Sequence, residues 1–567
     1  MLSKSRRQTA KLLLGMIAIT GIYILVSFLR LPSEPENQFL FGLSQKRLAL
    51  GMVLFVILVM NIGAVFWLGS NPKDWQIDIE DKVNAWITNH IEFGMVTLYF
   101  TTLATGLLLL VVFQPASRAF KFFEPLRELL GGPALWLAFS SLLLTIFFKV
   151  NYGELIRKDK FMMAVDHFLL AAFVFLTIFY SYKHLLIWMS AGNQPSYTYW
   201  NLLADEFLKG KLYLENPVQN HDLTLYQGKW FVPMPPLPAI LMLPQAFLFG
   251  GQNINTSNFS IFFSAINAVL VFLILEQLVR RKWIKLSPLP VSLLLLVALF
   301  AFGNPHLWVG IMGRAWFVSQ IVSVTFLALA VLTALKSWSP WLVGISLGLA
   351  IAARPNGIMT WPFVFAIAMQ IIKEEGGAID WKKILNWSVK SLLPMGVAVT
   401  GLLVYNYARF ENFFDFGYTT IKGDPGIVAN AQTYGIFSTH YILTNIKVML
   451  FYFPAIQPGY QWPVLPSTTG MSIFLVTPPL IYLFRRYERK WWITGAWVSV
   501  LFNFALLVLY HNTGAHQFGY RYILDVSVPL IMLLATALGK KLSWHFMILL
   551  LFSILFNIYG AYWFITG

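Results

Sequence analysis

The longest polar stretch of the chain, residues 190–234, contains the side chains best suited to acid–base chemistry. Asp222 directly follows His221, and Asp205 lies earlier in the same stretch. A carboxylate placed next to a hydroxyl can act as the general base that activates it. Each aspartate also has a simpler explanation: Asp205 and Glu206 suit the solvated face of a surface helix, and Asp222 suits a turn cap. We favour the surface helix for Asp205 and the catalytic role for Asp222.

Four arginines are suited to binding an anion, because a guanidinium pairs with phosphate through two parallel hydrogen bonds. They stand at or close to the ends of apolar segments and are Arg314, Arg354, Arg409 and Arg521. A lone arginine at such a place commonly only extends its charge to lipid headgroups. Several on one outer face run against the usual charge distribution and favour a shared phosphate ligand. The neighbouring residues that complete the candidate binding set are His221, Lys229, Asn356, Tyr418, His516, Tyr522 and Asp525.

Asp525 stands a few residues inside an expected membrane span. A carboxylate inside a membrane is costly, so it generally has a partner and often a function. Arg521 is four residues earlier, one helical turn away, which makes a structural ion pair between the two the simpler explanation. The sequence leaves both explanations of Asp525, the ion pair and a ligand contact, open.

The composition indicates a protein embedded in a bilayer. Of the 567 residues, 57% are hydrophobic and 12% are charged, whereas soluble proteins carry about 25% charged residues. The net charge of +16 comes from short basic clusters beside apolar segments, which is the pattern of cytoplasmic loops and predicts no nucleic-acid partner. Cysteine is absent, which excludes disulfides, a thiol nucleophile and cysteine metal ligands.

About fifteen apolar segments are long enough to cross the ~30 Å of hydrocarbon in a bilayer. The expected fold is therefore an all-α polytopic membrane protein, a helical bundle with membrane lipids as its surroundings. The spans are expected near residues 11–30, 48–69, 94–114, 131–150, 161–189, 258–279, 287–303, 315–335, 340–353, 357–373, 387–407, 470–484, 491–511, 523–539 and 544–564.

The basic residues set the orientation of these spans, because lysine and arginine accumulate in cytoplasmic loops. Lys4, Arg6 and Arg7 place the N-terminus inside. The other basic loops are then cytoplasmic only if the apolar segment 236–250 does not cross, so we expect a re-entrant or interfacial helix there. The basic loops inside are then 280–285, 374–386, 485–490 and 540–543, and the polar loops outside are 190–257, 304–314, 354–356, 408–469 and 512–521.

Two local structures are predicted in the first large outer loop. Residues 198–209 form an amphipathic pattern that ends at Gly210, and a glycine suits the end of a helix. Gly228 lies between two short aromatic segments and predicts the turn of a β-hairpin. The prolines at 235, 236 and 238 then introduce the interfacial helix, since proline is tolerated at a helix start.

Motifs of several other functional classes are absent. The chain has no Gly-Lys-Ser/Thr phosphate loop, which argues against a nucleotide-driven pump. It has neither a His-Glu-x-x-His zinc motif nor a Gly-x-Ser-x-Gly hydrolase motif. Few ionisable residues lie within spans (Asp166 with His167 is one case), which argues against a proton relay or an ion channel.

The order of the outer-face features resembles that of membrane glycosyltransferases of the C-type fold. These use polyprenyl-phosphate sugars and include the protein O-mannosyltransferase and aminoarabinose transferase relatives. The resemblance covers residues 161–567, with about eleven spans, and leaves 1–160 as a group of about four extra spans. The segments that carry it are Leu203-Ala-Asp-Glu-Phe-Leu-x-Gly210, Tyr226-x-Gly-Lys-x-Phe-x-Pro-x-Pro-Pro-Leu-Pro238, Phe249-Gly250, Arg354-Pro-Asn-Gly357, Asn406-x-x-Arg409-Phe410 and Gly519-Tyr-Arg-Tyr-x-x-Asp525.

The resemblance implies an inverting glycosyltransferase of the plasma membrane with its active site on the outer face. It would move a sugar from a polyprenyl-phosphate donor to a hydroxyl of a glycan, lipid or protein acceptor. Asp222, with Asp205 in reserve, would be the base. Arg521, Arg354 or Arg409 would hold the departing phosphate. A divalent cation could assist at the carboxylates, although no dedicated metal site is predicted.

One departure from the resemblance keeps two other functions open. Family members carry an acidic residue just after the first core span, where this chain has Gln194-Pro195-Ser196-Tyr197. A catalytically inactive assembly protein of the same fold would explain the missing carboxylate. A transporter or flippase of lipid-linked glycans is the alternative from another class. It predicts polar residues along the whole membrane depth, whereas here they gather on one face.

Overall fold

The computed structural model describes residues 160–190, 196–286, 290–457, 464–514, 516–540 and 542–566, together with Met52, Phe55, Val56 and Val59. The four spans expected before residue 151 otherwise lie outside the described residues. The chain divides into two units, Met1–Leu176 with Leu248–Asn253 and Thr177–Phe247 with Ile254–Gly567. The candidate site described below belongs wholly to the second unit.

Seven helices of the described residues are long and apolar enough to cross a bilayer. A helix rises 1.5 Å per residue, so about 20 residues cover ~30 Å of hydrocarbon. This part of the chain is therefore a polytopic all-α membrane protein, as predicted. The bounds of these helices are α6 (Lys160–Ser190), α9 (Thr256–Arg280), α12 (Ala315–Leu335), the 3-10 helix η4 (Pro355–Thr360) continued by α14 (Trp361–Gly376), α15 (Trp381–Phe410), α19 (Trp491–Val508) and α21 (Trp544–Thr566).

Two expected spans are shorter than the bilayer requires. The segment near 287–303 forms α10 (Pro290–Phe302), which is followed after a bend of 56° by α11 (His306–Met312). The segment near 340–353 forms the 14-residue helix α13 (Pro340–Ala353).

The segments 470–484 and 523–539 are not the single helices that the hydropathy predicted. The first forms α18 (Ile473–Val476) and the 3-10 helix η7 (Pro478–Phe484), and the second forms the 3-10 helix η8 (Arg521–Val526) and α20 (Ser527–Ala537). Prolines explain both interruptions. Pro478 and Pro479 lack amide hydrogens, and the ring of Pro529 would clash with a helical carbonyl at Asp525. A hydropathy pattern does not take account of these backbone restrictions of proline.

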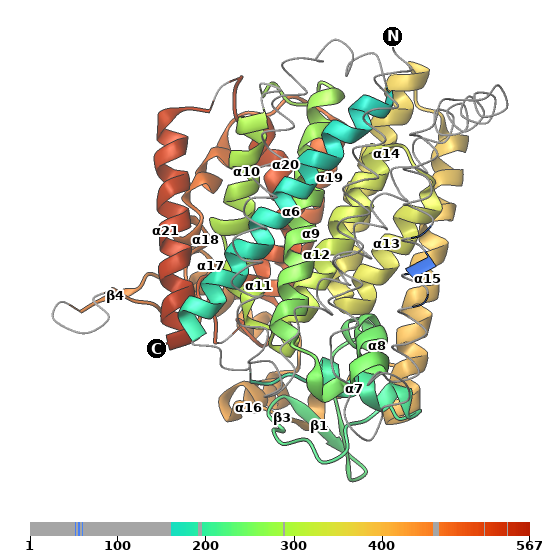
Figure 1. Cartoon of the computed structure of the whole chain (residues 1–567), viewed down its shortest axis with the longest axis vertical. Helices are drawn as coiled ribbons and strands as arrows, with labels where there is room; N and C mark the ends of the chain where they lie inside the picture. Colours follow the sequence, from blue (N-terminus) through green and yellow to red (C-terminus); the bar gives the residue numbers. More distant parts are fainter. Residues whose placement is uncertain are drawn as a thin grey trace. The chain divides into compact units, whose positions relative to one another are not determined.

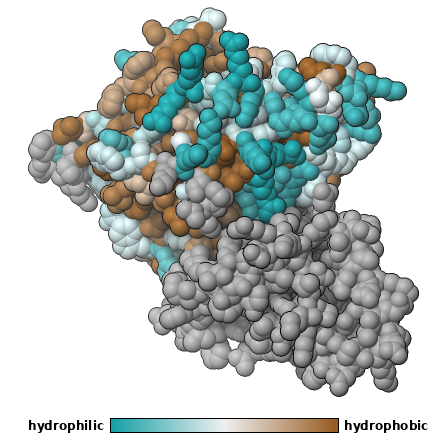
Figure 2. Space-filling view, turned by 90° about the horizontal axis from the view of Figure 1, so that it is seen from above, coloured by the Kyte–Doolittle hydropathy of each residue, from teal (hydrophilic) through white to brown (hydrophobic). Residues whose placement is uncertain are grey.

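The described basic loops meet at one end of the bundle. Helices α9 and α12 run in the same direction, because Ser257 at the start of α9 lies against Gly313 just before α12. Their far ends are joined by a hydrogen bond from Arg281 Nε to the carbonyl oxygen of Leu335 (2.6 Å). Figure 2 views the molecule from this end and shows hydrophilic side chains gathered over it. The loops that contact one another there are 280–285, 374–386 and 485–490.

The opposite end carries a short helix and a small sheet (Figure 1). The predicted helix is α7 (Trp200–Leu208), and Gly210 after it has a φ of +74°, as expected at a helix end. The predicted hairpin consists of β1 (Leu223–Tyr226) and β2 (Lys229–Phe231). Its turn residues, Gln227 and Gly228, have φ values of 47° and 75°, which is the geometry of a type I′ turn.

A third strand, β3 (Ile421–Lys422), joins this sheet from the segment that follows α15. The sequence did not predict it, because two residues are too few for a strand pattern. It pairs antiparallel with β1, and Leu223 lies opposite Lys422. The sheet therefore ties the first large polar loop to a segment almost two hundred residues later in the chain.

The apolar segment 236–250 forms α8 (Leu237–Phe249), whose 13 residues extend only about 20 Å. The chain enters α8 from Pro233 and Pro235, which lie at the sheet end, and α9 begins at that same end. The segment between them therefore does not cross the bundle, in agreement with the prediction from the basic loops. The 3-10 helix η3 (Gly251–Asn253) follows α8.

The remaining elements follow α15. Helix α16 (Pro425–Tyr434) is capped at its start by Asp424 and has no buried residue. The other elements are η5 (Tyr418–Thr420), η6 (Thr439–Tyr441), α17 (Ile442–Phe451) and the strand pair β4 (Ala455–Ile456) and β5 (Val464–Leu465).

Candidate functional site

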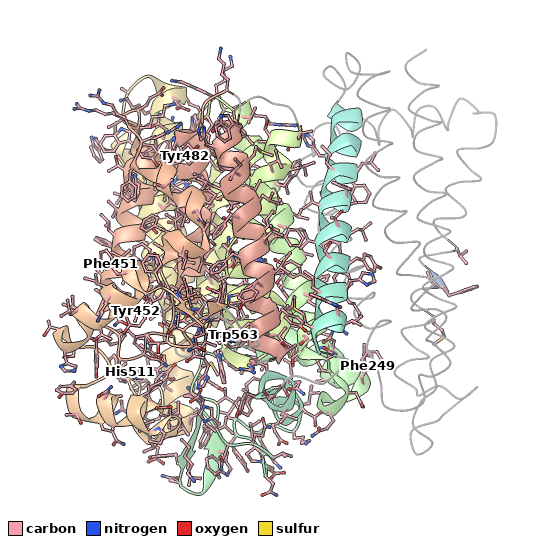
Figure 3. The ribbon with its side chains drawn as sticks, turned by 90° about the vertical axis from the view of Figure 1, so that its left-hand side faces the viewer. Phe249, Phe451, Tyr452, Tyr482, His511 and Trp563 are labelled. Atoms are coloured by element: carbon pink, nitrogen blue, oxygen red, sulfur yellow. The ribbon has the colours of Figure 1, made fainter. Side chains whose placement is uncertain are left out.

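A cavity of about 910 Å³ lies at the end of the bundle that carries the sheet. In Figure 3, the lining residue His511 lies toward this end and Tyr482 toward the opposite one. The polar loops that the sequence placed on one face thus converge on a single cavity. The predicted site residues that line it are His221, Asp222, Arg314, Arg354, Asn356, Tyr418, His516, Arg521 and Tyr522.

Asp205, the reserve base, does not line the cavity. It stands on α7 and forms an ion pair with Lys209 one turn later (3.3 Å), which Glu206 also contacts (3.0 Å). Asp205 thus has the surface-helix role that the sequence favoured, whereas Glu206, expected on the same solvated face, is buried. We therefore no longer assign Asp205 a role as base.

Lys229 and Arg409 also lie outside the cavity lining. Lys229 is exposed on β2, with its Nζ 4.9 Å from the centre of the Tyr213 ring. Arg409 is 3% exposed and donates to the carbonyl oxygen of Val232 (2.6 Å) and to Asn406 Oδ1 (2.8 Å). The expected phosphate contact of Arg409 is therefore not supported, and this arginine instead anchors the segment that continues into the cavity wall.

Asp525 lies behind the cavity wall and does not pair with Arg521. Its Oδ2 atom accepts hydrogen bonds from Arg354 Nη2 and from Asn356 Nδ2, both at 2.9 Å, and its Oδ1 atom accepts one from Gln320 Nε2 (3.2 Å). The expected ion pair with Arg521 is wrong because residues 521–526 form a 3-10 helix. With three residues per turn, positions i and i+4 point about 120° apart.

Asp222 is held at the cavity by its backbone. Its amide donates to the carbonyl oxygen of Lys422 (2.5 Å), and its φ is +60°. The carboxylate lies where a side chain at Gly423 would be, since a Cβ there would stand 2.7 Å from Asp222 Oδ1. His221 Nε2 approaches the same oxygen at 3.8 Å. Burial raises the pKa of Asp222 above its usual value, while the positive charges of His221, Arg521 and His516 oppose that shift.

The cavity wall contains two further aspartates, and both are occupied by local backbone bonds. Asp424 Oδ1 caps α16 by accepting from the amides of Gly426 (2.9 Å) and Ile427 (3.2 Å). Asp415 Oδ1 accepts from the amide of Gly417 (2.7 Å). Asp222 has no such bond within the described residues. It is therefore the lining carboxylate best placed to accept a proton from a ligand.

The three lining arginines differ in how their charge is balanced. Asp525 compensates Arg354 through the ion pair described above. Arg314 and Arg521 form no ion pair with a carboxylate within the described residues. Their guanidinium groups lie over aromatic rings, Arg314 at 5.8 Å from the Tyr197 ring and Arg521 at 4.6 Å from the Tyr522 ring. Burial lowers the pKa of both arginines. The cavity thus offers two uncompensated cations to a ligand.

Three lining residues have a left-handed backbone, with φ values of 59° at Tyr197, 60° at Asp222 and 57° at His516. This conformation costs a non-glycine residue about 1 kcal/mol or more, and it persists where the surroundings impose it. Three such residues line the same cavity, which suggests that the exact positions of their side chains matter for function.

Another part of the wall is apolar. Helix α16 contributes Ile427, Val428 and Ala431, and the chain then adds Ile436 and Phe437. Phe437 lines the cavity and is also 54% exposed, so the apolar wall continues to the surface of the protein. The cavity is therefore amphipathic and suits a ligand with a charged head and an apolar tail.

No group of three or more histidine or acidic side chains within the described residues is arranged to hold a metal ion. The assistance of a divalent cation thus remains a prediction. A ligand phosphate could supply the further oxygen atoms that a hard cation needs.

The residue most clearly missed by the sequence reasoning is Gln320, which lies in the second turn of the apolar helix α12. Its side chain is completely buried and contacts both Arg521 and Asp525. A buried amide in a span was a usable signal, because such a group needs hydrogen-bond partners. Comparisons of the chain with protein-family models, with curated proteins and with solved structures found no match.

Proposed function

We propose that this protein is a membrane glycosyltransferase that moves a sugar from a polyprenyl-phosphate donor to an acceptor hydroxyl. The observation that carries the proposal is the amphipathic cavity, in which Asp222 shares one space with the uncompensated Arg314 and Arg521. A lipid-linked sugar phosphate has the matching parts: an anionic phosphate, a polar sugar and an apolar chain that the wall at α16 would accommodate.

In the proposed reaction, Asp222 removes the proton from the acceptor hydroxyl as its oxygen attacks the anomeric carbon. The bond between that carbon and the phosphate oxygen breaks, and the phosphate leaves with the bonding electrons. Arg314 and Arg521 stabilise the charge that develops on it. The raised pKa of Asp222 supports this role, because a stronger base takes up the proton more readily. Arg354 is already paired, so we assign it to positioning.

We further propose that the cavity faces the outer side of the plasma membrane. The basic loops gather at the other end of the bundle, and basic loops are typically cytoplasmic. The donor and acceptor would then meet on the outer surface of the cell.

The test is transfer of sugar from a polyprenyl-phosphate donor by the full chain in nanodiscs. Replacing Asp222 by asparagine should lower the rate about 100-fold or more, because the base is lost while the shape is kept. The matched control is Asp205→Asn, which removes the same charge outside the cavity and should leave the rate unchanged. Full activity of Asp222→Asn would eliminate the proposed mechanism.

An inactive assembly protein of the same fold is the second candidate, because no carboxylate stands at residues 194–197. Ser196 and Tyr197 line the cavity, while Gln194 and Pro195 lie outside the described residues. This candidate predicts that the wild-type chain binds a lipid phosphate without transferring sugar. A lipid transporter is less well supported, since the charged groups of the cavity gather at one end.

A further inference from the structure

Arg521 is a buried cation whose side-chain hydrogen bonds are all long. It is 5% exposed and lines the cavity. Its guanidinium donates to the Gly514 carbonyl oxygen (3.4 Å), to Tyr522 Oη (3.4 Å) and to Gln320 Oε1 (3.5 Å). Hydrogen bonds from N–H groups to oxygen ordinarily measure about 2.7–3.2 Å. Arg521 is therefore held in place by neutral acceptors without being saturated by them.

Gln320 is the side chain that connects Arg521 to the rest of the charged network. It lies one turn beyond Trp316 and Phe317 on α12 and is completely buried. Its Nε2 atom donates to the Arg521 carbonyl oxygen (2.9 Å) and to Asp525 Oδ1 (3.2 Å). Both partners are pure acceptors, so the amide must present its NH2 group to them. Its oxygen is then the atom that faces the Arg521 guanidinium.

The side chain at position 320 is neutral. This matters because glutamate, which has almost the same shape as glutamine, would carry a negative charge at the same place. A carboxylate at residue 320 would stand beside Arg521 and cancel its charge. The nearest acid, Asp525, is already engaged by Arg354 and Asn356. A buried cation without a counter-ion is unfavourable, and an anionic ligand would relieve that penalty.

We infer that Gln320 is a positioning residue that holds Arg521 at the cavity without neutralising it, so that the guanidinium charge is kept for the phosphate of a lipid-linked ligand. This inference rests on the proposed function and deepens it. It assigns the selectivity for an anionic head to a neutral side chain in the second turn of α12, which does not itself line the cavity.

The test measures binding of farnesyl phosphate, a short isoprenyl phosphate, to the full chain in nanodiscs, with farnesol as the uncharged probe. Three variants are compared with the wild type: Gln320→Glu, Gln320→Met and Gln432→Glu. Gln432 is exposed on α16 and does not line the cavity, so it controls for adding one negative charge. Elution volume and melting temperature report on folding.

Gln320→Glu should weaken farnesyl phosphate binding at least about tenfold, the value of one charged hydrogen bond, and leave farnesol binding unchanged. Gln320→Met should weaken it by a smaller factor, because the charge remains while its support is lost. Gln432→Glu should bind like the wild type. If Gln320→Glu does not fold, Gln320→Met decides, and unchanged binding of that variant overturns the inference.

Equal binding of farnesyl phosphate by Gln320→Glu and the wild type would also overturn the inference and leave the proposed function standing. Absence of farnesyl phosphate binding by the wild type would instead overturn the proposed function. Equal loss of farnesol and farnesyl phosphate binding in Gln320→Glu would show a general packing defect and would likewise refute a role in selecting the anionic head.

Discussion

Asp222 combines a strained backbone with a carboxylate that lacks a local cap. The bond from its amide to Lys422 fixes the backbone, and the missing side chain of Gly423 leaves room for the carboxylate. Gly423 is not in the left-handed region, so space and not backbone freedom explains the glycine. The position of the proposed base is thus set by a residue in another loop.

This arrangement predicts the effect of Gly423→Ala. The new Cβ would stand 2.7 Å from Asp222 Oδ1, so the carboxylate must turn away. Displacing a reacting group by about 1 Å can lower a rate roughly 100-fold, and we expect a loss of transfer activity of that order with little change in melting temperature. The control is Gly396→Ala, where a Cβ meets nothing within 4 Å. Equal activity of both variants would refute the positioning role.

At the scale of single residues, chemistry that is local in the sequence could be predicted and long-range partners could not. His221 and Asp222 are neighbours in the chain, and both line the cavity. Sequence spacing offered Arg521 as one possible partner of Asp525, whereas the partner in the structure is Arg354, 171 residues away. A span pattern carries no information about which distant side chain will satisfy a buried acid.

At the scale of elements, local patterns could again be predicted, whereas pairing between distant segments could not. Gly210 and Gly228 mark the end of α7 and the turn of the hairpin, because both need a positive φ that glycine adopts freely. Strand β3 has two residues and no pattern of its own. The pairing of β3 with β1 helps to form the site. It could not be predicted, because it depends on where the chain runs after α15 and not on a pattern within β3.

Arg409, at the end of α15, anchors the segment at Val232 that continues into the cavity wall. Its guanidinium lies 3.9 Å from the centre of the Tyr405 ring. Arg409→Lys keeps the charge but loses the forked donors that reach Val232 and Asn406. We expect the protein to be destabilised by about 2–3 kcal/mol, seen as a lower unfolding midpoint. Farnesyl phosphate affinity of the folded variant should be unchanged.

The matched control for this anchor is Arg486→Lys, an exposed arginine at the basic end, which should alter neither property. The opposite pattern for Arg409→Lys, an unchanged unfolding midpoint with lost affinity, would show that Arg409 binds the phosphate after all. The two roles of an arginine, anchor and ligand contact, are thereby separated by measurement.

At the scale of the whole molecule, the second unit has two chemically different ends. One end carries the cavity and the sheet, and the other carries the basic loops. Positive loops are typically cytoplasmic, so the cavity end is expected outside. The absence of cysteine makes this orientation directly measurable, because a single introduced thiol is labelled against no background.

We therefore expect opposite labelling of two exposed positions by a membrane-impermeant maleimide. Val218, which is 99% exposed beside the sheet, should react in intact cells when replaced by cysteine. Lys382, exposed at the basic end, should react as cysteine only after the membrane is permeabilised. The unchanged chain should not react under either condition. Labelling of Lys382→Cys but not Val218→Cys in intact cells would place the cavity on the cytoplasmic side, and a donor presented on the outer surface could then no longer reach Asp222.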